Sequence, residues 1–135
     1  FQKTYPQSCF YSEEKHGEWR FPLLALDPLD GTREFIEGRP EWAISIGHFA
    51  SEDFDGDGWV CNPVTNEVFT MSTVHARILE SDKFVGEVSR SEYHEGLFRG
   101  DASSRISVVP MGSIAYKLGR LSHGKSDFVI SKRPK

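Results

Sequence analysis

Short apolar runs bounded by turn residues recur along the chain. The clearest run is LLAL (residues 23–26), which follows Pro22 and precedes the turn-like segment DPLDG. This pattern predicts a buried strand with Asp27 at its end. The same criteria predict strands at residues 42–49, 83–91, 105–112 and 126–132, and two strands within residues 58–71 joined by a Pro/Asn turn.

Helical character is confined to two segments. Residues 32–37 predict a short helical turn, and residues 113–124 predict a longer helix that Gly124 closes. Strands interrupted by so few helices favour a mixed α/β or α+β arrangement over a regular βαβ series. We expect the apolar stripe of the longer helix to pack in the core. It consists of Ile114, Ala115, Leu118 and Leu121.

Composition limits the classes of function. A length of 135 residues matches one domain, residues 1–135. The 16 basic and 20 acidic residues give a net charge of −4 and no basic face for a nucleic-acid polymer, and no apolar run reaches the roughly 18 residues of a membrane span. Cys9 and Cys61 form no metal-binding pair, so a reducing cytoplasm is the simplest compartment. A start at Phe1 and a basic end at SKRPK are interpreted as a chain truncated at both ends.

The segment DPLDG brings two carboxylates close to backbone N–H groups. Pro28 fixes the direction in which the chain leaves the strand after Asp27. Asp30 is expected to be the N-cap of the next helix, whose first N–H groups would face an anion. Mg²⁺ prefers oxygen ligands and is usually held by one or two carboxylates together with substrate phosphate. The segment therefore predicts a metal-bound phosphate, although an ordinary turn uses the same residue types.

A second acidic element lies upstream and completes a recognisable pattern. Glu13 and Glu14 precede the first strand and are expected to fold back against its C-terminal end. In this order, SEE, the apolar strand, DPLDGTREF and GRPEWAISIG resemble the inositol monophosphatase superfamily of Mg²⁺-dependent, lithium-sensitive phosphomonoesterases. NPVTNEVF and VPMGSIAYKLGRLSHGKSDFVISKRPK are similar to later parts of that family, and VSRSEYHEGLF resembles its 3′(2′),5′-bisphosphate nucleotidase branch.

The resemblance implies a layered α/β sandwich, two or three Mg²⁺ ions and direct attack of a metal-activated water on phosphorus. The implied metal ligands are the carboxylates of Glu13, Asp27 and Asp30 and the backbone carbonyl of Leu29, and Thr32 would orient the attacking water. The implied substrate-binding residues are Gly31 and Thr32, followed by Gly112, Ser113 and Ile114 near the start of the longer helix.

The implied substrate is a small phosphorylated metabolite. The nucleotidase branch favours 3′-phosphoadenosine 5′-phosphate, and Lys132 and Arg133 are expected to meet its second phosphate, although basic residues at a strand end are commonly solvated. An inositol or sugar monophosphate is the alternative. A catalytically inactive metal- or phosphate-binding fragment is an alternative from another class. No membrane or nucleic-acid partner is expected, and a homodimer stays open.

One acidic motif invites a calcium interpretation. DFDGDG places Asp53, Asp55 and Asp57 at positions 1, 3 and 5 of an EF-hand-like loop. Position 12 is Val64 where a bidentate Glu is required, and no helical pattern flanks the loop. We therefore interpret the segment as the acidic tip of a hairpin.

Overall fold

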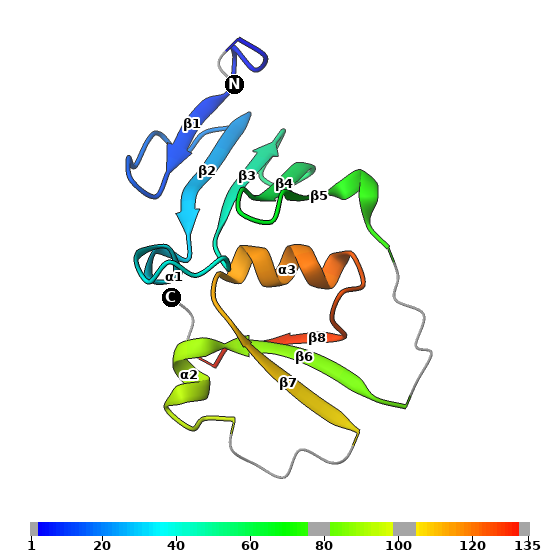
Figure 1. The fold of residues 1–135 in the computed structure, drawn as a ribbon. Helices are drawn as coiled ribbons and strands as arrows, with labels where there is room; N and C mark the ends of the chain where they lie inside the picture. The colour runs from blue at the N-terminus through cyan, green and yellow to red at the C-terminus, as the bar shows by residue number, and fades with distance from the viewer. Residues whose placement is uncertain (1–2, 76–81, 99–104, 133–135) are drawn as a thin grey trace.

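Two β-sheets lie on either side of one helix in the structure, a computed structural model that describes residues 3–75, 82–98 and 105–132 (Figure 1). Within these residues, one sheet has five strands in the order β1-β2-β3-β4-β5 and the other has three in the order β7-β6-β8. Helix α3 (Ile114–Ser122) lies between the sheets. The predicted mixed α/β class is confirmed.

The five-stranded sheet contains four predicted strands and one that the sequence pattern did not indicate. β1 pairs in parallel with β2, and each later pair is antiparallel. β2 continues past the predicted end at Asp27, because a bulge between Asp27 and Asp30 lets pairing resume opposite Ala43. The strands are β1 (Cys9–Ser12), β2 (Leu23–Asp30), β3 (Ala43–Phe49), β4 (Gly56–Asn62) and β5 (Glu67–Thr70), and the 3₁₀ turn η1 (Met71–Thr73) follows.

The second sheet is parallel throughout its described strands. Its central strand β6 (Phe84–Ser89) pairs with β7 (Ile106–Met111) and β8 (Phe128–Ile130). The carboxyl ends of these strands meet at one edge, where ligands commonly bind in α/β sheets. That edge lies on the same side of the molecule as α1 (Thr32–Ile36), which follows β2 (Figure 1). A short helix, α2 (Arg90–His94), follows β6.

Helix α3 packs with a different face from the one predicted. Ile114 and Leu118 are 45% and 50% exposed, so the predicted core stripe is wrong. Gly119 faces the sheet instead, because a Cβ there would lie 2.5 Å from the Phe69 ring. The buried cluster at this contact consists of Ala43, Phe69, Met111 and Tyr116, with Val60 packed against it.

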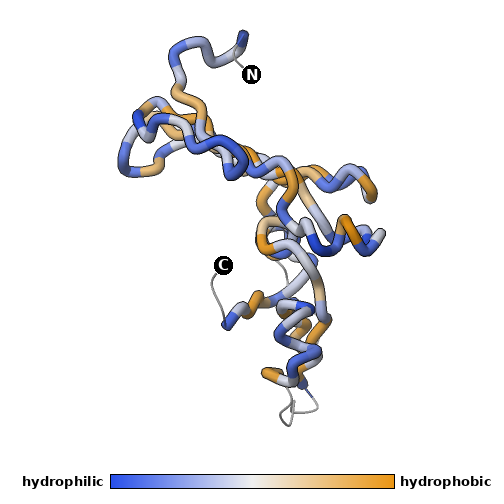
Figure 2. The backbone as a smooth tube through the Cα atoms, turned by 90° about the vertical axis from the view of Figure 1, so that its left-hand side faces the viewer, coloured by the Kyte–Doolittle hydropathy of each residue, from blue (hydrophilic) through white to orange (hydrophobic). Residues whose placement is uncertain are grey.

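Hydrophobic residues alternate with hydrophilic ones along the described trace (Figure 2). No described helix is long and apolar enough to cross a membrane. Asp53 and Asp55 of the acidic motif lie in the turn between β3 and β4, and Asp57 lies at the start of β4. In this turn the Ala50 N–H donates to the Asp55 carbonyl at 2.8 Å, and Phe54 has a positive φ of 56°. The prediction of an acidic hairpin tip is therefore confirmed.

Glu67 joins β5 to α3 and to the loop that follows α3. Its carboxylate accepts hydrogen bonds from the Tyr116 hydroxyl, the Lys125 ammonium and, at 2.8 Å, the Thr65 hydroxyl. Burial alone would raise the pKa of the Glu67 carboxyl. The hydrogen bonds outweigh that effect and lower its pKa to about 2.

This lowered pKa predicts an acid-sensitive contribution to stability. The contribution is complete above the ordinary glutamate pKa and is lost as the pH falls from about 4.5 toward 2. Allowing for solvent screening, we expect the free energy of unfolding to fall by about 1–2 kcal/mol more in the wild type than in Glu67→Gln between pH 7 and pH 3. Urea unfolding at both pH values measures the difference, and parallel losses in the two proteins would contradict this role.

Candidate metal centre

The end of β2 is folded by local hydrogen bonds. The Asp27 Oδ1 atom accepts the Leu29 N–H at 3.0 Å, and the Thr32 hydroxyl donates to the Leu29 carbonyl at 3.1 Å. Gly31 has a φ of 94°, and a Cβ on it would lie 3.2 Å from the Ser113 Cβ. Its conformation and this close approach both favour glycine. The Asp27 carboxylate, the Leu29 carbonyl and the Thr32 hydroxyl therefore lie close together in the turn between β2 and α1.

Asp30 does not cap the helix that follows it. The N-cap of α1 is Gly31, which has no side chain to bond to the helix. The Asp30 Oδ2 atom instead accepts the Ser113 hydroxyl and the Ala115 N–H, both at 2.6 Å. The predicted N-cap role is therefore wrong, because the distant helix α3 offers better-placed donors.

Glu13 lies beside the carboxyl end of β2 because β1 runs parallel to β2. It directly follows β1, and its N–H donates to the Leu26 carbonyl at 3.4 Å. The negative charge of Asp27 is the main reason why the pKa of the exposed Glu13 carboxyl is raised, and slight burial and a hydrogen bond with Asp27 add to it. The expectation that Glu13 folds back beside the strand end is confirmed.

These oxygen donors fit a hard cation. Among the described residues, no three His, Cys, Asp or Glu side chains lie close enough together to enclose a metal alone. Mg²⁺ does not need such a cage, because it keeps several waters and uses one or two carboxylates. A cation would also relieve the repulsion between Glu13 and Asp27. The candidate donor set is Glu13, Asp27, Asp30 and the Leu29 carbonyl.

An open cavity of about 1350 Å³ extends from these carboxylates between the first sheet and α3. Thr32 and Gly31 line it, together with Gly112, Ser113 and Ile114. Hydroxyl groups from the carboxyl ends of the second sheet line it as well. The structure therefore brings most of the implied substrate-binding residues to one cavity. The second-sheet lining residues with hydroxyls are Ser89, Ser91 and Ser131.

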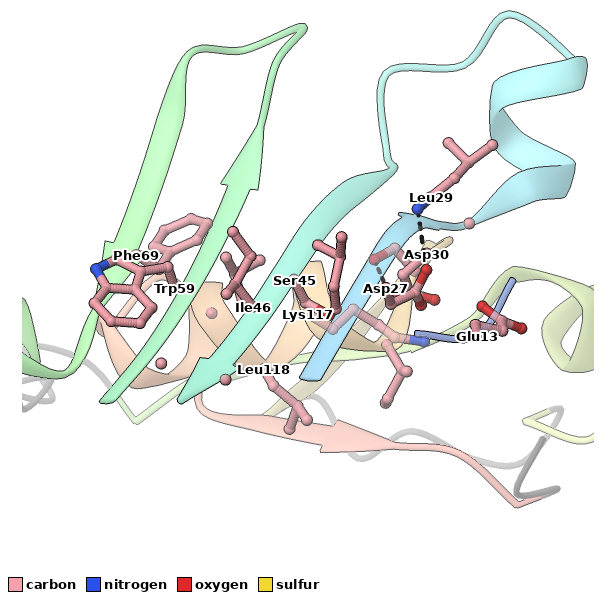
Figure 3. A pocket seen from close by; sticks show the side chains of 18 of the residues that line it. Glu13, Asp27, Leu29, Asp30, Ser45, Ile46, Trp59, Phe69, Lys117 and Leu118 are labelled. Atoms are coloured by element: carbon pink, nitrogen blue, oxygen red, sulfur yellow. Dashed lines mark hydrogen bonds between the residues drawn. The ribbon is translucent and has the colours of Figure 1, made fainter. Parts of the chain in front are cut away.

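Sequence reasoning missed Lys117, which extends from α3 toward the end of β2 that carries Asp27 and Asp30 (Figure 3). Its side chain lines the cavity, and the residue is only 3% exposed. Burial lowers the pKa of Lys117, and the nearby Asp30 carboxylate opposes this effect. A lysine in an amphipathic helix normally signals a solvated face, so the sequence held no sign of this role.

The structure does not bring Lys132 to the cavity. Its ammonium donates to the Leu97 carbonyl at 2.5 Å and lies 4.9 Å from the centre of the Phe98 ring. Lys132 is not among the residues that line the cavity, and Arg133 lies outside the described residues. The geometry therefore gives no support to the expected contact of Lys132 with a second phosphate.

Comparisons with known proteins agree on one family. The model of the inositol monophosphatase family matches residues 1–91. "Nus factor SuhB" of Vibrio cholerae is 36% identical over 75 residues, which cover 51% of this chain and 27% of that protein. "Inositol-1-monophosphatase" of Rhizobium meliloti is 30% identical over 100 residues, which cover 74% of this chain and 32% of that protein. The chain thus spans about a third or less of these curated relatives.

Solved structures show the same fold. An IMPase from Thermotoga maritima superposes with a TM-score of 0.80 over 98% of this chain and 57% of that one, at 23% identity. A staphylococcal IMPase-II with bound inositol monophosphate superposes with a TM-score of 0.69 over 94% of this chain and 56% of that one, at 18% identity.

Proposed function

We propose that this chain, which belongs to the inositol monophosphatase family, carries the metal site of a phosphomonoesterase that acts on a small phosphorylated metabolite. The observation that carries the proposal is that Glu13, Asp27 and Asp30 line one cavity together with a cationic residue, Lys117. Carboxylates alone suit a metal, but a phosphate site also needs positive groups facing the anion. Both are present in this cavity.

Glu13, Asp27, Asp30 and the Leu29 carbonyl would hold divalent ions, with Mg²⁺ as the expected metal and two or three as the expected number. When bound, such ions lower the pKa of water and neutralise phosphate oxygens. The Thr32 hydroxyl is already oriented by the Leu29 carbonyl at 3.1 Å and would align the attacking water. The first N–H groups of a helix have no partner within the helix, so those of Gly31 and Thr32 would bind phosphate oxygens.

The proposed substrate is 3′-phosphoadenosine 5′-phosphate, as the VSRSEYHEGLF segment suggests. Lys117 lines the same cavity and provides a positive group that can face an anionic substrate. Relatives named inositol monophosphatase make an inositol or sugar monophosphate the alternative.

Phosphate release tests the proposal. The chain is incubated with 3′-phosphoadenosine 5′-phosphate, inositol 1-phosphate or a sugar phosphate, with Mg²⁺ or with EDTA. We expect Mg²⁺-dependent release that is fastest with the bisphosphate. Faster release from inositol 1-phosphate would select the alternative substrate. Substrate binding without release would support the inactive fragment and contradict the proposal.

Thr32→Ala tests the proposed orientation of water. We expect the variant to lower kcat more than it raises KM, because alignment of the nucleophile acts on the chemical step rather than on substrate binding. Steady-state kinetics of phosphate release separate the two constants. Thr65→Ala is the matched control, because its hydroxyl contacts Glu67 and not the cavity. An unchanged kcat in Thr32→Ala would contradict the role.

A further inference from the structure

Ser113 joins the candidate metal centre to helix α3 through a pair of short hydrogen bonds. Its hydroxyl lies 2.6 Å from the Asp30 Oδ2 atom and 2.9 Å from the Tyr116 nitrogen. The Tyr116 N–H is a donor, so the Ser113 oxygen accepts that bond and keeps its own proton for Asp30. The hydroxyl orientation is therefore fixed from both sides.

Asp30 is held by only one of its two oxygens. Oδ2 accepts both the Ser113 hydroxyl and the Ala115 N–H, which is among the first N–H groups of α3. Oδ1 has no hydrogen-bond partner among the described residues, and Asp30 lines the cavity. Two bonds to a single oxygen stop rotation of the carboxylate and leave the other oxygen for a ligand in the cavity.

The backbone at Ser113 supports a specialised role for this residue. Ser113 has a φ of 49°, which is unfavourable for a residue with a side chain, and it is only 7% exposed. The Ser113 Cβ is also one of the atoms that a Cβ on Gly31 would meet, at 3.2 Å. Such a conformation persists only where its surroundings fix it, here the contact between the end of β2 and the start of α3.

We infer that Ser113 is a positioning residue, not a substrate ligand. It couples the packing of α3 against the end of β2 to metal binding by Asp30. The inference rests on the proposed function and goes beyond it. It makes the metal affinity of the site depend on the packing of a helix whose first residues are 83 to 85 positions from Asp30 in sequence. By linkage, the free energy by which packing of α3 favours metal binding at Asp30 equals the free energy by which bound metal favours packing of α3.

Ser113→Gly is the sharpest variant, because it removes the hydroxyl yet suits both the positive φ and an N-cap position. We expect its dissociation constant for Mn²⁺ to rise about 10- to 100-fold, as is common when a partner of a metal ligand is lost. Titration of the 135-residue chain with Mn²⁺, followed by the EPR signal of the free ion, measures it. The rise in melting temperature on adding Mn²⁺ should shrink in parallel.

Ser122→Ala is the matched control. It removes a hydroxyl from the other end of α3, where the side chain donates to the Gly119 carbonyl at 2.8 Å. Ser122 also lines the cavity, but it is about 13 Å along the helix from Ser113 at a rise of about 1.5 Å per residue. We expect this variant to bind Mn²⁺ like the wild type. If Ser113→Gly also bound Mn²⁺ within twofold of the wild type, the inference would be overturned while the proposed function stood. A wild type that bound no Mn²⁺ would overturn both.

Discussion

Replacing Asp30 with asparagine is expected to reduce Mg²⁺-dependent phosphate release to the background without protein. The substitution removes the negative charge of a candidate metal ligand whose Oδ2 atom accepts two hydrogen bonds from α3 and its N-cap. The amide oxygen can still accept from Ser113 and Ala115, but these bonds are no longer charge-assisted. We expect the free energy of unfolding to fall by only about 1–3 kcal/mol. Phosphate release and urea unfolding of the same preparation measure the two effects.

Asp53→Asn provides the matched control for Asp30→Asn. The chemical change is the same, but Asp53 lies in the exposed turn between β3 and β4 and does not line the cavity. Its phosphate release should equal that of the wild type. Normal turnover in Asp30→Asn, with Mg²⁺ still required, would remove Asp30 from the metal site.

Arg120→Met is expected to lower the free energy of unfolding by about 3–5 kcal/mol. Arg120 extends from α3 to the second sheet, where its Nε donates to Glu87 at 2.7 Å. Glu87 is only 2% exposed, and its other oxygen has no hydrogen-bond partner within the described part of the chain. Loss of the guanidinium would leave a carboxylate buried without compensation, whereas the methionine keeps most of the packing of the arginine stem.

Two further variants test whether the lost stability comes from the buried Glu87 carboxylate or from loss of a positive charge in general. Glu87→Met combined with Arg120→Met should recover most of the lost stability, because the carboxylate that lost its partner is removed as well. Arg39→Met, which breaks the exposed pair with Glu37, should change stability little. Urea unfolding compares all of them. If the double variant were less stable than Arg120→Met, desolvation of Glu87 would not be the cause.

Local patterns in the sequence predicted much of the first sheet and part of the site. The apolar run before DPLDG corresponds to β2, residues 42–49 correspond to β3, and the two strands predicted around the Pro/Asn turn correspond to β4 and β5. Each of these strand predictions depended on residues that are close in sequence, where turn chemistry and alternation are informative. The convergence of Glu13 with Asp27 was also expected, but it depends on the parallel pairing of β1 with β2, a strand that the sequence pattern did not indicate.

Contacts between distant residues explain what the sequence could not show. The true partners of Asp30 are Ser113 and Ala115, and an aspartate before a glycine gives no sign of them. The buried face of α3 was predicted wrongly because Gly119, which carries no apolar side chain, is what lets Phe69 approach the helix. Lys117 was missed for a related reason, since burial of a lysine depends on the assembled cavity and not on its neighbours in the chain.

The most direct measurement is the position of a bound metal. A crystal of the chain grown with Mn²⁺ and inorganic phosphate, with data collected at the manganese absorption edge, locates the metal by anomalous scattering. We predict a peak bounded by Glu13, Asp27, Asp30 and the Leu29 carbonyl, with phosphate beside it in the cavity. An ordered site with no peak at these oxygens, or a peak only at a different group of residues, would contradict the assignment of the metal centre.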